Sequence, residues 1–157
     1  MPHQLLDQIL EKANEVHDLY HRLVLVVMPE TEQSASLANL SRQADINVIN
    51  VNLELSRRML PLTTRQRALK AAAFMSNIVA SVASELLILN HIEILFDPAL
   101  QQEPLRLLEN LSRRKTIVAL WPGTIQGSYL VYAEPEHAEY RRYPTRELVL
   151  LHLEPVA

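Results

Sequence analysis

Four short runs rich in branched apolar residues recur along this chain, and they constrain its fold more than any other feature. They are residues 22–28, 46–51, 85–90 and 115–121. Runs of about four to eight such residues, bounded by turn residues, are typical of strands that are buried on both faces of a parallel sheet. The chain is therefore expected to build its core around such a sheet.

Helical patterns separate these strands. Apolar residues recur at helical spacing in segments 3–19, 34–43, 64–84 and 98–114. We expect the third of these helices to start at Thr63 or Thr64 and to be largely buried, and a short helix capped by Asn52 or Ser56 to stop near Pro61. The alternation predicts an α/β fold with a mostly parallel sheet and helices on both faces. Segments 128–132 and 147–153 are predicted to be strands at the edge of this sheet.

Length and composition favour one domain over residues 1–157. Its expected parts are an N-terminal helix over 1–20, βαβ units over 22–123, and edge strands with a tail over 124–157. The absence of cysteine excludes disulfides, thiolate zinc sites and a cysteine nucleophile. Because no apolar run approaches the roughly 20 residues of a membrane span and the first residues lack a signal-peptide pattern, we expect a cytoplasmic protein without a membrane partner.

Ligands of parallel α/β sheets bind beyond the carboxyl ends of the strands, so the segment after the first strand is the first place to look for a site. A phosphate-binding loop has the pattern G-x-x-x-x-G-K-[ST] at this point. Residues 28–35 instead read Met-Pro-Glu-Thr-Glu-Gln-Ser-Ala, and the chain has no glycine before Gly123. Without the glycines and the lysine, ATP binding in the usual way is excluded.

The end of the third strand departs from the same pattern. A nucleotide hydrolase carries an acid there to hold Mg²⁺, whereas this chain has Asn90 and His91. Two parts of the machinery are missing together, so we expect no cofactor, with ATP and Mg²⁺ as the alternative. We expect structural roles for Glu93 and Asp97, and packing or partner contact for Trp121. The candidate residues of this degenerate nucleotide pocket are Pro29, Thr31, Ser34 and Asn90.

Several segments resemble the BrxF family, the small P-loop-type components of type 3 BREX phage-defence systems. These segments are residues 22–36, 85–97, 104–113, 116–123 and 132–141. The resemblance implies an AAA-type P-loop core and a bacterial complex with the large BREX ATPase and the methyltransferase. The altered loop at 28–35 and Asn90 depart from the family's pattern. Resemblance and departure together predict a non-catalytic subunit that assembles with BREX partners or with itself.

A basic block gives an alternative function. Residues 55–84 hold five bases and no acid in a chain of net charge -3. Such a block is either a solvated helix face or a patch for phosphates or acidic partners, and as a patch it predicts binding of double-stranded DNA. Its members are Arg57, Arg58, Arg65, Arg67 and Lys70. Further bases for such contacts are Arg113 to Lys115 and Arg141 with Arg142.

The remaining alternative is an AAA-type ATP switch, in which Arg113, Arg114 or Arg141 of one protomer reaches a nucleotide held by its neighbour. Zinc chemistry is disfavoured. His17 and His21 imitate the H-E-x-x-H motif, but Asp replaces the catalytic Glu and no third ligand is evident. The H-x-E pattern at His91 belongs to zinc sites that also need cysteines, which this chain lacks.

Overall fold

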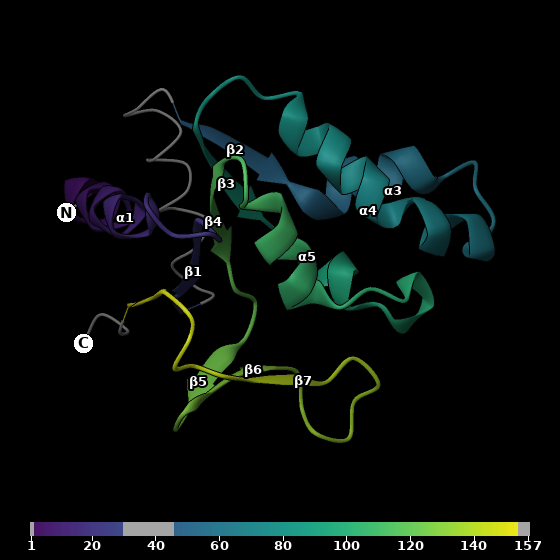
Figure 1. Ribbon diagram of the computed structural model, residues 1–157. Coiled ribbons are helices and arrows are strands. Elements are labelled where there is room, and N and C mark those ends of the chain that lie inside the picture. Colours follow the sequence, from purple (N-terminus) through teal and green to yellow (C-terminus); the bar gives the residue numbers. More distant parts are fainter. Residues whose placement is uncertain (1, 30–45, 154–157) are drawn as a thin grey trace.

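The computed structural model of this protein describes residues 2–29 and 46–153. A five-stranded sheet forms its centre, in the order β2-β3-β4-β1-β8, and every neighbouring pair is parallel (Figure 1). The expected helix over 34–43 lies outside the described residues. The strands are β1 Leu23–Val27, β2 Asn47–Asn50, β3 Leu86–Asn90, β4 Thr116–Leu120 and β8 Leu150–His152. The predicted α/β fold with a parallel sheet is confirmed.

Helices cover both faces of this sheet (Figure 1). Helix α1, Pro2–Val16, packs through Ile9 and Val16 against the face that carries Val24 and Val26 of β1. Helices α3 (Val51–Met59), α4 (Thr64–Ala80) and α5 (Pro104–Leu111) pack against the opposite face. Successive strand residues point to opposite faces, so a strand between two helix layers must be apolar throughout. This is why β1 and β4 are buried along their whole length.

The strand order sets where a ligand site is expected. The chain leaves β1 toward β2, on one side of the sheet, and leaves β4 toward β8, on the other side. Neighbouring strands whose connections run in opposite directions form a topological switch point, where ligands of such sheets usually bind. Here the switch point lies between the carboxyl ends of β1 and β4.

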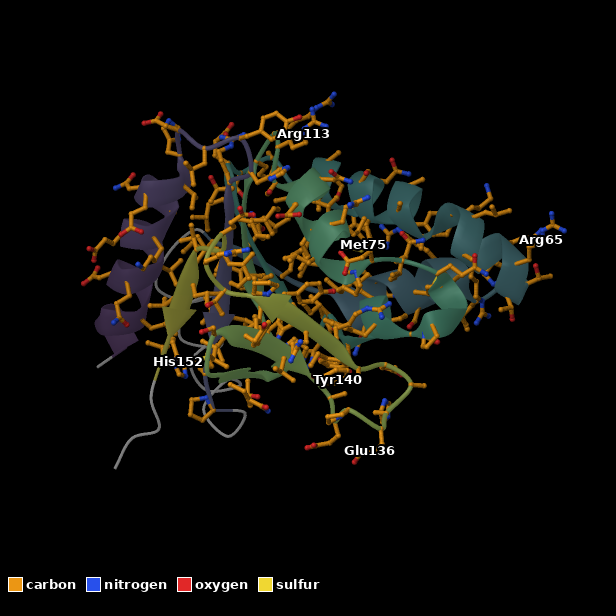
Figure 2. The ribbon with its side chains drawn as sticks, turned by 60° about the horizontal axis from the view of Figure 1, so that its bottom comes forward. Arg65, Met75, Arg113, Glu136, Tyr140 and His152 are labelled. Atoms are coloured by element: carbon orange, nitrogen blue, oxygen red, sulfur yellow. The ribbon has the colours of Figure 1, made fainter. Side chains whose placement is uncertain are left out.

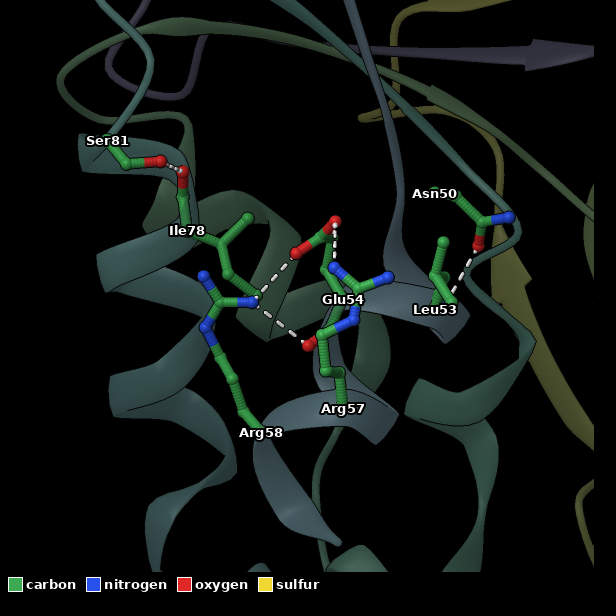
Figure 3. Close-up of polar contacts among 7 residues, drawn as sticks. All are labelled: Asn50, Leu53, Glu54, Arg57, Arg58, Ile78 and Ser81. Atoms are coloured by element: carbon green, nitrogen blue, oxygen red, sulfur yellow. Dashed lines mark hydrogen bonds and ion pairs between the residues drawn. The ribbon is translucent and has the colours of Figure 1, made fainter.

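Local capping explains where α3 and α4 begin. Asn50, the last residue of β2, caps α3 by accepting a hydrogen bond from the Leu53 amide at 3.0 Å (Figure 3). The expected cap at Asn52 or Ser56 is therefore wrong, because the strand passes into the helix without a loop. Thr63 caps α4 as predicted, in a reciprocal pair of hydrogen bonds with Gln66.

Two expectations for the helices are wrong. Helix α4 buries only one stripe, Ala71, Met75, Ile78 and Val79, and Leu69 on another side is 74% exposed. The expected helix over 98–114 is divided: short 3-10 turns at Glu93–Phe96 and Pro98–Leu100 precede α5. Gln101, in the left-handed region with φ 54, ends the second turn, and Pro104 then opens α5.

The C-terminal third forms a second sheet that the sequence did not predict. Strands β5 (Thr124–Gln126), β6 (Tyr129–Tyr132) and β7 (Arg141–Pro144) pair in an antiparallel sheet of order β5-β6-β7. The expectation that 128–132 joins the edge of the main sheet is wrong, because β6 pairs on one side with β5, across the short turn at residues 127–128, and on the other side with β7, across the loop at residues 133–140. Strand β8 does lie at the main edge, beside β1. Across residues 2–29 and 46–153, every helix is too short or too polar to cross a bilayer.

Candidate functional site

The carboxyl edge of the parallel sheet is the candidate site, and two of the four predicted pocket residues lie there. Pro29 follows β1 and is partly buried, and Asn90 is the last residue of β3. Strand β4 runs between them. Thr31 and Ser34 lie outside the described residues. The structure thus brings one member of the predicted pocket close to the switch point and a second to the neighbouring strand end.

The Asn90 side chain is engaged in its own turn. Its Oδ1 accepts a hydrogen bond from the backbone amide of His91 at 2.8 Å. His91 has a φ of 51°, a left-handed conformation that costs a non-glycine residue roughly 1 kcal/mol or more. The amide therefore stabilises the reversal of the chain after β3.

Asn52 ties the start of α3 to the segment after β3. Its Nδ2 donates to Glu93 Oε2 at 2.8 Å, and its Oδ1 accepts from the Ile94 amide at 2.8 Å. The backbone amide of Asn52 also donates to the His91 carbonyl at 2.9 Å. Sequence reasoning missed this role and gave Asn52 a capping function, because its partners lie more than forty residues away in the chain.

An aromatic cluster closes the carboxyl edge beside β4. Trp121 follows β4 directly, is fully buried, and donates from Nε1 to the Val131 carbonyl at 3.0 Å. Phe96 meets Trp121 edge-on at 5.3 Å between ring centroids and stacks on Tyr132 at 3.9 Å, while Tyr143 meets Trp121 at 5.9 Å. These rings join the second sheet to the main one. The predicted packing role of Trp121 is confirmed.

Gly123 permits the close approach of the two sheets. A Cβ atom at this position would lie 1.9 Å from the Val131 carbonyl oxygen, far inside any real contact distance. Gly127, by contrast, has open space around it and is needed for its φ of 61° in the turn between β5 and β6. The two glycines of the chain both serve the second sheet.

The surroundings of two tyrosines in the second sheet raise the pKa values of their hydroxyl groups. Burial raises the pKa of Tyr132 to about 12, and the negative charges of Glu139 and Glu93 act in the same direction. Burial also raises the pKa of Tyr143, helped by its hydrogen bond to Glu103. Both hydroxyls are therefore protonated at neutral pH and donate to carboxylates, Tyr132 to Glu139 at 3.4 Å.

The acidic and histidine residues singled out for metals have structural roles. Glu93 is held by Asn52, and Asp97 accepts a hydrogen bond from the Ala99 amide at 2.9 Å. Helix α1 ends at Val16, so His17 and His21 do not share a helix. Within residues 2–29 and 46–153, no group of three or more side chains is placed to hold a metal ion.

The basic block does not form one patch. Arg57 and Arg58 both pair with Glu54, at 3.7 Å and 2.9 Å (Figure 3). Arg67 turns inward and donates from Nε to the Met59 and Leu62 carbonyls, at the end of α3. Only Arg65 and Lys70 of the five point into solvent without such a contact in the described part of the chain.

The other candidate arginines lie in two places. Arg141 and Arg142 are neighbours on β7: Arg142 lies over the Tyr129 ring at 4.1 Å, and Nε of Arg141 is buried with no hydrogen-bond partner among the described residues. Arg113 and Arg114 lie at the amino edge of the parallel sheet, away from the carboxyl edge that carries Asn90.

No family model, curated protein or solved structure matches this chain.

Proposed function

We propose that this protein is a non-catalytic subunit built on a P-loop-type core, which works by assembling with the other components of a BREX phage-defence system, including its large ATPase. One observation carries the proposal. At the carboxyl end of β3, where a hydrolase requires an acid to hold Mg²⁺, this chain has Asn90 and His91, and the Asn90 Oδ1 accepts a hydrogen bond from the His91 amide at 2.8 Å. The choice of system rests on the sequence resemblance to the BrxF family.

The arrangement of the sheet supports a P-loop-type core. In such a core the phosphate loop after the first strand and the acid after the third must face the same edge. Here β1 and β3 end at one edge with only β4 between them. The groups that would act there are replaced: the lysine and the glycines are missing from the sequence, and Trp121 packs at the end of β4.

Nucleotide binding separates this proposal from an AAA-type switch. We expect calorimetry with ATP and Mg²⁺ to show a dissociation constant weaker than about 1 mM, equivalent to roughly 4 kcal/mol of binding free energy. We also expect no phosphate release above the protein-free rate. Turnover that Asn90→Ala or Ser34→Ala abolishes would contradict the proposal and favour the switch.

Assembly is tested by co-expression of the tagged chain with the other components of a type 3 BREX system. We expect a complex that persists through size-exclusion chromatography, with a mass by light scattering that does not depend on added ATP. Asn90→Ala serves as the matched control and should remain in the complex, because the Asn90 amide serves a local turn. Elution of the chain alone, with or without ATP, would contradict an assembly role.

DNA binding through residues 57–70 receives less support. Arg57 and Arg58 both pair with the Glu54 carboxylate, and Arg67 donates hydrogen bonds to backbone carbonyls. Phosphate contacts need several free cations on one surface, and this segment offers Arg65 and Lys70. Those two are five positions apart on α4 and so face different directions.

A further inference from the structure

A groove of about 840 Å³ opens at the amino edge of the parallel sheet, between the C-terminal ends of α4 and α5, with polar and apolar side chains in its lining. Three successive bases, Arg113, Arg114 and Lys115, line it, and Asn77 and Asn110 add amide groups. No carboxylate is found among the described residues that line this groove. Its volume is at the upper end of the range for small-ligand sites, so it has room for part of a longer chain.

An exposed aromatic ring lies at one side of the groove. The Arg113 guanidinium carbon lies 4.7 Å from the centroid of the Tyr20 ring, a cation–π contact that holds the guanidinium in place. Tyr20 nevertheless stays 67% exposed. The ring also meets His21 edge-on, at 4.8 Å between ring centroids. The exposed part of a ring held in this way beside a fixed arginine offers a stacking surface for a nucleobase.

The local field in the groove is positive although the chain as a whole is acidic. Lys115 donates from Nζ to the carbonyls of Val79 and Val82, so its charge compensates the negative end of α4. Arg113 and Arg114 then remain for a ligand. Figure 2 shows Arg113 and Glu136 at opposite ends of the molecule, which places the exposed acidic loop around Glu136 far from the groove.

We propose that this groove binds single-stranded nucleic acid, with phosphates on Arg113 and Arg114 and a base stacked on Tyr20. A single strand presents phosphates and unstacked base faces together, as the groove requires. A duplex hides its base faces, so it would offer Tyr20 no ring to stack on. The site lies at the opposite edge of the sheet from Asn90, and this inference does not depend on the function proposed above.

Fluorescence anisotropy of a labelled oligothymidine of about 15 nucleotides tests the proposal. We expect binding at low salt that weakens with a log–log slope of about -1.4 as salt rises, because each of the two phosphate contacts to a single strand contributes roughly 0.7. The double variant Arg113→Gln, Arg114→Gln should lose at least about tenfold in affinity, and Tyr20→Ala about tenfold. Tyr20→Phe should retain affinity, since it keeps the ring.

The matched control is Arg65→Gln, Lys70→Gln, which removes the same charge from the N-terminal half of α4, whereas the groove is lined by the C-terminal end of that helix. Figure 2 shows Arg65 well apart from Arg113. The control should change affinity less than about twofold, and circular dichroism should show all variants folded. Equal losses in the two double variants overturn the proposal, as does stronger competition by duplex DNA or tripolyphosphate than by unlabelled oligothymidine. A groove variant that changes the mass by light scattering and leaves oligonucleotide affinity intact assigns the groove to protein contact, which also overturns it.

Discussion

The two edges of the parallel sheet differ in what their side chains are bonded to. At the carboxyl edge, Asn52, Asn90 and Trp121 all direct their polar groups at other parts of the same chain. At the amino edge, Arg113 and Arg114 line an open groove beside an exposed Tyr20. Ligand sites of parallel sheets usually lie at the carboxyl edge. Among the described residues, the polar groups named at the carboxyl edge are used within the chain, whereas Arg113 and Arg114 at the amino edge have no carboxylate partner in the groove.

Substitution of Trp121, at the carboxyl edge, should give the largest loss in the free energy of unfolding. Trp121→Ala removes a fully buried ring that three other elements contact, and we expect the free energy of unfolding to fall by about 3–5 kcal/mol. Trp121→Phe keeps a ring but leaves the Val131 carbonyl without its donor, so a smaller loss of about 1–3 kcal/mol should follow. Urea denaturation measures both. A loss below about 1 kcal/mol for the alanine variant would show that the aromatic cluster does not hold the two sheets together.

The two glycines offer a matched pair. Gly123→Ala places a Cβ atom against the Val131 carbonyl, which must move, and should cost about 2–3 kcal/mol. Gly127→Ala has space for its methyl group and suffers only the left-handed conformation, with a cost of about 1 kcal/mol. Thermal unfolding compares the two variants. Equal losses would mean that the turn after β4 adapts, and that the approach of the sheets is not tight.

Alkaline pH should loosen the second sheet. The folded-state pKa of Tyr132 is raised to about 12 from a usual value of 10, so the unfolded chain loses this proton more readily than the folded chain. The resulting stability is fully present below pH 10 and is lost as the pH rises through about 12. Tyr132→Phe should flatten this part of the stability–pH curve, because it removes the hydroxyl whose pKa is raised. A wild-type curve that is already flat over this range would contradict the assigned shift.

Substitutions at the amino edge should change the free energy of unfolding least. Arg113→Gln with Arg114→Gln should lower the free energy of unfolding by no more than about 0.5–1 kcal/mol, the contribution of the exposed cation–π contact between Arg113 and Tyr20, because neither arginine side chain has a carboxylate partner among the described residues that line the groove. Lys115→Met removes the donor to two carbonyls at the end of α4 and should cost about 1 kcal/mol. Urea denaturation of the three proteins separates bases used for folding from bases left for binding. A large loss of unfolding free energy in the double arginine variant would show that these two bases also stabilise the fold, and the two edges would then not differ in this respect.

Much of the fold could be predicted from short-range patterns. The buried strands were found because a strand covered on both faces has apolar residues at every position. The cap at Thr63 was found because its partner, Gln66, is three residues away. The helix expected over 98–114 was wrong because Pro98 and Pro104 are each compatible with a first helical turn, and the chain uses both.

The candidate site shows the same division. Pro29 and Asn90 were placed at the carboxyl edge because each follows a predicted strand. The hydrogen bonds of Asn52 to Glu93 and Ile94 were missed. These partners lie 41 and 42 positions further along the chain, and no local sequence pattern indicates a contact over such a separation. Burial of Trp121 was expected, but its ring partner Tyr143 comes from a sheet that the sequence did not reveal.

By itself, the sequence determined that this chain folds around a parallel sheet and that residues 28–35, after its first strand, lack the glycines and the lysine of a phosphate-binding loop. Both follow from residues that are neighbours in the chain, through runs of consecutive apolar residues and through the residue types that follow the first of these runs. Only the tertiary structure decided that the carboxyl edge is closed by a second sheet and that Tyr20 lies beside Arg113, ninety-three residues later. Such contacts depend on the order in which strands pair, and pairing order is set by packing of the whole core rather than by any local segment.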